Sequence, residues 1–85
     1  MEEAVQLWER VRASNPEALI DRLSLIIHYQ RVDEIDRLKQ IGEEIRQAHP
    51  QYTAEQALEA FQARDDITDE ELQEFGRGFK LAGLP

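Results

Sequence analysis

Two prolines that lie 34 residues apart, Pro16 and Pro50, constrain this chain more than any other feature. The residue before a proline avoids helical backbone angles, so a helix is expected to end ahead of each of them. Between the prolines lie two stretches in which apolar residues recur every three or four positions, over residues 17–30 and 34–48. The prolines therefore bracket a predicted pair of helices joined by a short turn.

Three further helices are predicted outside this pair. Residues 2–14 carry an amphipathic helical pattern ahead of the first proline. After the second proline, Thr53 begins a fourth helix and Thr68 a fifth, each followed three residues later by Gln or Glu, which is the spacing of a capping box. Gly83 is a natural stop for the fifth helix. We therefore expect an all-α fold of about five antiparallel helices, forming a single domain over residues 1–85.

The helix over residues 17–30 is the most apolar part of the chain. Its hydrophobic side chains are spread around most of the helix circumference, which is typical of a helix buried on more than one side. Asn15 is its expected N-cap, and Asp33 is the expected N-cap of the next helix. In that next helix, Gly42 either admits the close approach of another helix or is a tolerated defect of roughly 1 kcal/mol relative to alanine.

An internal repeat appears when the sequence is shifted by 34 residues. Residues 1–16 then lie over residues 35–50, and the apolar stripes of the two segments coincide. Four identical residues also meet: Gln6, Glu9, Arg12 and Pro16 lie over Gln40, Glu43, Arg46 and Pro50. This divides the chain into a half repeat (1–16), a full repeat (17–50), and a terminal half repeat with a cap (51–85).

A period of 34 residues is that of the tetratricopeptide repeat. Trp8, Val11 and the Asn15-Pro16 pair resemble the second half of such a repeat, and Leu25 and Tyr29 fall where it carries leucine and tyrosine. A second similarity covers about 35 residues and resembles the C-terminal end of bacterial tetratricopeptide proteins, including some class III adenylate cyclases. It rests on His49-Pro50, Tyr52-Thr53, Arg64-Asp65 and the ending Ala82-Gly83-Leu84-Pro85. The resemblance implies a stack of helix pairs with a C-terminal capping helix, which binds other proteins.

Charge and composition exclude several classes of function. The net charge of −8 argues against nucleic-acid binding and against anionic membrane surfaces. No apolar run approaches the roughly 20 residues that span a bilayer. The chain has no cysteine, and its start lacks the features of a signal peptide. We therefore expect a cytoplasmic protein with no cofactor, no nucleic-acid partner and no membrane partner.

The resemblance also implies where a partner would bind. In tetratricopeptide arrays, the first helix of each pair lines a concave groove, and a peptide binds there. Carried over to this chain, the groove would be lined by Ile20, Leu23, Ser24, Ile27, Arg31, Ala57, Phe61 and Arg64. Ser24 and Ile27 stand where recognition of an acidic C-terminus would require Lys and Asn. The alternative interpretation is that these apolar residues belong to the core, or contact a preceding helix that is missing from the repeat.

Two other function classes compete with this one. Acidic residues cluster between residues 65 and 71 and could serve metal binding or acid–base catalysis, but acids at a helix start also complement the helix dipole. We expect no catalysis. The chain could also be a regulatory tail of a larger signalling enzyme. The favoured hypothesis is a protein–protein interaction or scaffold module that binds a protein or peptide and forms a homo-oligomer through its first or second helix.

Overall fold

The computed structural model describes residues 2–85, and these form helices and no strand. The prediction of an all-α fold is confirmed. The described helices are α1 (Glu2–Ser14), α2 (Ile20–Arg31), α3 (Ile35–Ala48), α4 (Ala54–Gln62) and α5 (Asp69–Leu81). Whether the helix pairs are tetratricopeptide repeats, and whether the chain divides at residues 16 and 50, remain predictions.

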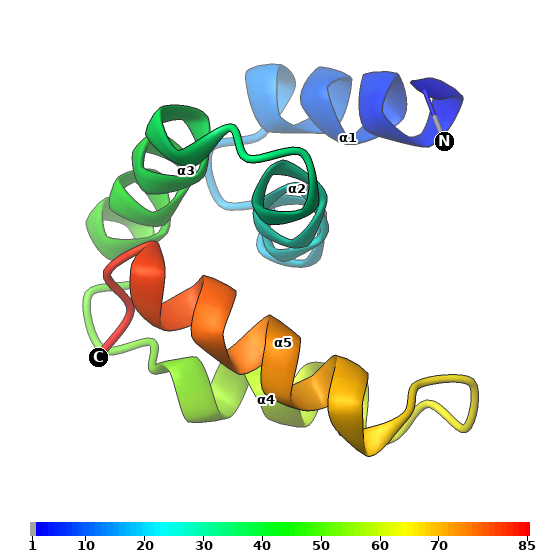
Figure 1. Ribbon diagram of the computed structural model, residues 1–85. Coiled ribbons are helices and arrows are strands. Elements are labelled where there is room, and N and C mark those ends of the chain that lie inside the picture. Colours follow the sequence, from blue (N-terminus) through cyan, green and yellow to red (C-terminus); the bar gives the residue numbers. More distant parts are fainter. Residues whose placement is uncertain (1) are drawn as a thin grey trace.

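Helix α2 lies at the centre of the fold. In Figure 1 it is seen end-on, with α1 above it, α3 beside it and α5 below it. Leu23, Leu25 and Ile26, which lie at different positions around the helix, are all completely buried. The expectation that this helix is buried on more than one side is therefore correct.

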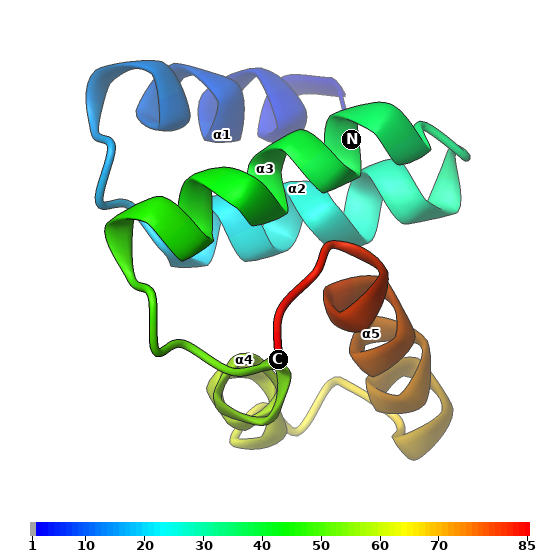
Figure 2. The same ribbon diagram turned by 90° about the vertical axis from the view of Figure 1, so that its left-hand side faces the viewer.

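The last two helices form a hairpin that closes the other end of the core. Phe61 of α4 packs against Phe75 and Phe79 of α5, with ring centroids 5.5 Å and 6.2 Å apart. After α5 the chain turns back at Gly83, whose φ of 94° is in the left-handed region. The carbonyl of Pro85 then accepts a hydrogen bond from the backbone N–H of Ala54, so the C-terminus is tied to the start of α4 (Figure 2).

The two capping boxes form as the sequence predicts. Thr53 accepts a hydrogen bond from the backbone N–H of Gln56, whose side chain accepts one from the Thr53 N–H. Thr68 and Glu71 make the same reciprocal pair at the start of α5. Both boxes satisfy backbone donors that a helix start leaves without partners.

Two helix starts differ from the prediction. Helix α2 begins at Ile20 rather than at residue 17, because the Asn15 side chain accepts a bond from the Glu17 N–H and holds a turn ahead of the helix. Asp33 is not the N-cap of α3. Its φ of 60° places it in the left-handed region, where it closes the turn between α2 and α3, and α3 begins at Ile35. Asp tolerates this conformation better than most residues.

Gly42 allows the end of α5 to approach α3 closely. Of the two interpretations of this residue, close packing is therefore correct and a tolerated defect is not. A Cβ at Gly42 would collide with the backbone of Ala82 at the end of α5. The same Ala82 carbonyl accepts a hydrogen bond of 2.8 Å from Arg46 of α3. The glycine therefore fixes where the C-terminal hairpin docks on α3.

None of the helices in the described part of the chain is long and apolar enough to cross a membrane.

Candidate functional site

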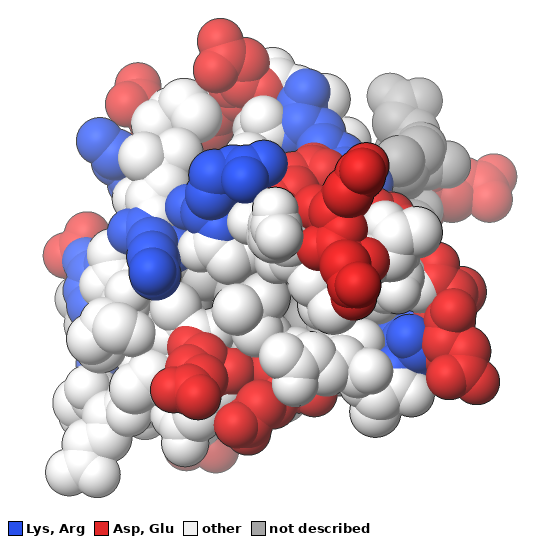
Figure 3. All heavy atoms as spheres, turned by 60° about the horizontal axis from the view of Figure 1, so that its bottom comes forward, with Lys and Arg blue, Asp and Glu red and all other residues white. Residues whose placement is uncertain are grey.

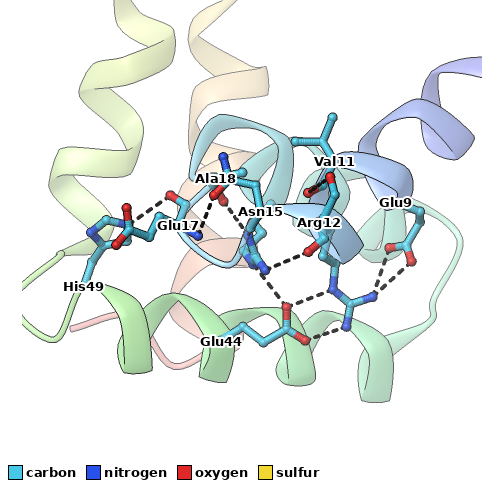
Figure 4. A network of polar contacts seen from close by, with 10 residues as sticks. Glu9, Val11, Arg12, Asn15, Glu17, Ala18, Glu44 and His49 are labelled. Carbon is cyan, nitrogen blue, oxygen red and sulfur yellow. Dashed lines mark hydrogen bonds and ion pairs between the residues drawn. The ribbon is translucent and has the colours of Figure 1, made fainter.

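A cluster of charged residues joins the first three helices. Glu44 of α3 accepts hydrogen bonds from Arg12 of α1, at 2.9 Å and 2.6 Å, and from Arg22 of α2, at 3.1 Å (Figure 4). Arg12 also contacts Glu9 one turn earlier on its own helix. Two arginines thus face two glutamates, and the cluster as a whole is electrically neutral.

Arg22 also closes the C-terminal end of α1. Its side chain is only 4% exposed, and it donates to the backbone carbonyls of Arg12, Asn15 and Ala18. Carbonyls at the end of a helix have no partner within the helix, and a cation there is favourable. The cluster therefore positions α1 on α2 and α3.

The charges in this cluster shift one another's titration. The hydrogen bond from Arg12, followed by the charges of Arg12 and Arg22, lowers the pKa of the Glu44 carboxyl, although burial opposes the shift. The hydrogen bond with Glu44 raises the pKa of the Arg12 guanidinium. Both groups therefore stay charged near neutral pH, and the ion pair between them persists there.

A cleft of about 670 Å³ lies beside the cluster and is lined by residues of all three helices. Its arginines are already engaged, because Arg12 and Arg22 each direct most of their N–H groups to protein oxygens. An anion in this cleft would have to displace Glu9 or Glu44. The arrangement holds helices together and offers no free charge to a ligand.

Two tyrosines have shifted titration as well. Burial raises the pKa of the Tyr29 phenol, although a hydrogen bond with Arg37 opposes the shift. Burial raises the pKa of the Tyr52 phenol too, assisted by the negative charge of Glu59. Both phenols are therefore protonated near neutral pH and cannot serve as bases.

The acidic segment between residues 65 and 71 is spread over a loop and the first turn of α5. Asp66 pairs with Arg64 at 3.3 Å, Glu71 caps α5, and both Glu71 and Glu74 contact Arg31 of α2. Within residues 2–85, no group of three or more His, Asp or Glu side chains is placed to hold a metal ion.

Four of the predicted groove residues lie along one ridge of α2. Ile20 and Arg31 are exposed and Ser24 is half-buried, whereas Ile27 lies just beneath the surface, 8% exposed. Arg31 reaches across to α5, where it pairs with Glu74 at 2.9 Å and lies over the ring of Phe75. It therefore holds α5 against α2.

The structure does not bring all the predicted groove residues together on one accessible surface. Leu23, Ala57 and Phe61 are core residues, and Arg64 lies in the loop beyond α4. The physical reason is that α5, rather than α4, packs against α2 on this side. The aromatic rings of Phe75 and Phe79 lie where the groove was expected and cover Phe61. The alternative interpretation of these apolar residues, that they belong to the core, holds for these three and for Ile27.

Two further surface features bear on function. On α1 and α2, Leu7 and Ile20 are about half exposed, at 55% and 50%. Between α4 and α5 lies a groove of about 380 Å³ whose lining is mainly apolar. The sequence signal for this groove is Gly76, which lies on the same face of α5 as Leu72 and has no side chain to fill the space.

Comparisons of the chain with protein families, with characterised proteins and with solved structures found no match.

Proposed function

We propose that this protein is a protein–protein interaction module that self-associates through the side of α1 and α2 turned away from α3. The observation that carries the proposal is the exposure of Leu7 and Ile20, two large aliphatic side chains that are half exposed although the chain has an otherwise well-formed core.

The positions of these two residues follow from the charged cluster. Arg12 and Arg22 both point to Glu44 of α3. Successive residues of a helix are rotated by about 100°, so Leu7 lies about 140° around α1 from Arg12, and Ile20 lies about 160° around α2 from Arg22. Both therefore belong to the side of their helices that faces away from α3. We call this side, which carries Leu7 and Ile20, the outer face.

The size of the outer face sets the expected strength of association. In a twofold dimer the same two side chains are buried in both copies, which contributes on the order of 4–6 kcal/mol. Loss of translational and rotational freedom opposes this by an amount of similar or larger size. A weak dimer, with a dissociation constant on the order of 0.1–1 mM, requires a net gain of about 4–5.5 kcal/mol. The proposal therefore requires the rest of the outer face to contribute beyond these two side chains.

Light scattering after gel filtration, together with sedimentation equilibrium, tests this from about 10 μM to about 1 mM protein. We expect the average mass to rise towards that of a dimer. The double variant Leu7→Gln and Ile20→Gln should stay monomeric over the same range. Leu81→Gln is the matched control, because Leu81 is 43% exposed but lies on α5. A chain that is monomeric throughout, or a dimer that survives the double variant, would overturn the proposal.

A further inference from the structure

The groove between α4 and α5 combines an apolar floor with a positively charged edge. Leu58 of α4 and Leu72 of α5 form its walls, and Gly76 forms part of the floor. The nearest atom to a Cβ added at Gly76 would be a methyl group of Leu58, at 3.3 Å, so the two helices approach closely at this point.

The charge on this groove is opposite in sign to that of the chain as a whole. Arg77 and Lys80 are its only charged lining residues, although the chain has 18 acidic and 10 basic residues. Within residues 2–85, neither Arg77 nor Lys80 forms an ion pair. Both are exposed, so both are available to a partner.

Figure 3 shows the side of the molecule that α4 and α5 form. Positive side chains lie mainly at the upper left of this view, a large group of negative side chains lies just right of its centre, and uncharged side chains occupy much of the area between and below them. Glu55 and Glu59 belong to α4 and four further acidic residues to the first half of α5, whereas Arg77 and Lys80 belong to the second half of α5. A uniformly anionic surface such as a membrane would be repelled by the acidic residues of α4. The pattern therefore suits a partner whose charge varies over short distances along its surface.

We infer that this groove binds an amphipathic helical segment of another protein, with apolar side chains on one face and Asp or Glu on the flank that meets Arg77 and Lys80. A helix laid in an apolar groove uses anchors at i, i+3, i+4 and i+7. The groove runs from Leu72 to Lys80, a length of about 12 Å along α5, and so accommodates two to three turns of such a helix. The charge of its edge selects acidic partners.

Selection from a phage-displayed library of random peptides, about four helical turns long, tests the inference with the intact chain as bait. We expect enriched peptides to share apolar residues three and four positions apart together with several Asp or Glu. In a titration with the most enriched peptide, amide NMR signals of Leu58, Leu72 and Gly76 should shift. Absence of enrichment, enrichment of basic peptides, or shifts confined to α1 and α2 would each overturn the inference.

The chain offers a matched pair of variants, because Lys39 and Lys80 are its only lysines and both are exposed. Lys80→Glu should weaken binding of the enriched peptide by roughly three- to tenfold, and Lys39→Glu should leave it unchanged within about twofold. Equal effects of the two variants would overturn the role of the basic edge. If the groove signals instead shift with protein concentration and no peptide, a second copy covers the groove and the inference of a different partner fails.

Discussion

The carbonyl oxygen of Ala82, at the end of α5, lies where a side chain at Gly42 of α3 would have to stand. Helix propensity alone would favour alanine at Gly42 by about 1 kcal/mol. The close approach reverses this preference, because the colliding atoms belong to backbone and cannot rotate away. Gly42 is therefore required by the tertiary structure and not by its own helix.

The first prediction follows from this contact. Gly42→Ala should lower the free energy of unfolding by about 1–3 kcal/mol, as expected when a side chain is forced into a filled space. Urea unfolding followed by circular dichroism measures the change. Gly76→Ala is the control, because its Cβ would meet only the end of the Leu58 side chain, which can move. That variant should be within about 1 kcal/mol of the native chain. A stabilised Gly42→Ala variant would show that α5 docks elsewhere.

The second prediction concerns Arg22, the most buried charged side chain of the described residues. Arg22→Met keeps much of the side-chain volume but removes the charge opposite Glu44 and the donors to three backbone carbonyls. Breaking one side of a buried ion pair in this way should lower the free energy of unfolding by about 3 kcal/mol. The fluorescence of Trp8, the only tryptophan, reports the transition.

Arg10→Met is the control for this prediction, since Arg10 is exposed on α1. It should change stability by no more than about 0.5 kcal/mol. If both variants lost the same amount of unfolding free energy, Arg22 would act through its effect on the net charge of the protein and not through its contacts.

The third prediction is a dependence of stability on pH. The folded structure lowers the pKa of Glu44 below its ordinary value of 4.5. The unfolded chain therefore binds this proton more readily, so the contribution of Glu44 to stability is fully present above about pH 5 and is lost as pH falls through the folded pKa. Between about pH 5 and pH 3, Glu44→Gln should lose less stability per pH unit than the native chain. Parallel pH profiles for the two proteins would contradict this.

The fourth prediction concerns the end of the chain. Leu84 is only 3% exposed, and the neighbouring Pro85 accepts the hydrogen bond from Ala54. Leu84→Ala should lower the free energy of unfolding by about 2–3 kcal/mol. It should also speed hydrogen exchange of the Ala54 amide, because the last residues no longer hold the start of α4. Leu81→Ala makes the same chemical change at an exposed position three residues earlier and should change stability by less than about 1 kcal/mol.

The local parts of this structure could be predicted from the sequence. The capping boxes at Thr53 and Thr68 and the stop at Gly83 depend on residues three or four positions apart, whose contacts are fixed once a helix starts or ends. The apolar periodicity of the five segments indicated five helices for the same reason. The fold class was therefore correctly predicted.

The candidate site was predicted only in part. Ile20, Ser24 and Arg31 are accessible on one ridge of α2, as the groove interpretation required. Leu23, Ile27, Ala57 and Phe61 are buried in the core. The sequence could not distinguish this burial, because an apolar residue looks the same whether it lines a groove or fills a core. The basic edge of Arg77 and Lys80 went unrecognised because it is significant only beside Leu58, which is distant in the sequence.

By itself, the sequence determined where helices begin and end to within a few residues, and that α2 is buried on several sides. Only the tertiary structure decided that α5, rather than α4, lies against α2, and that Arg12 and Arg22 share one carboxylate. Helix boundaries depend on hydrogen bonds between residues that are close in the sequence, so they can be predicted from local sequence patterns. The choice of packing partner depends on whether two helix surfaces are complementary in shape, as they are where Gly42 meets Ala82. These two residues are about 40 positions apart in the sequence, and only the folded chain brings them into contact.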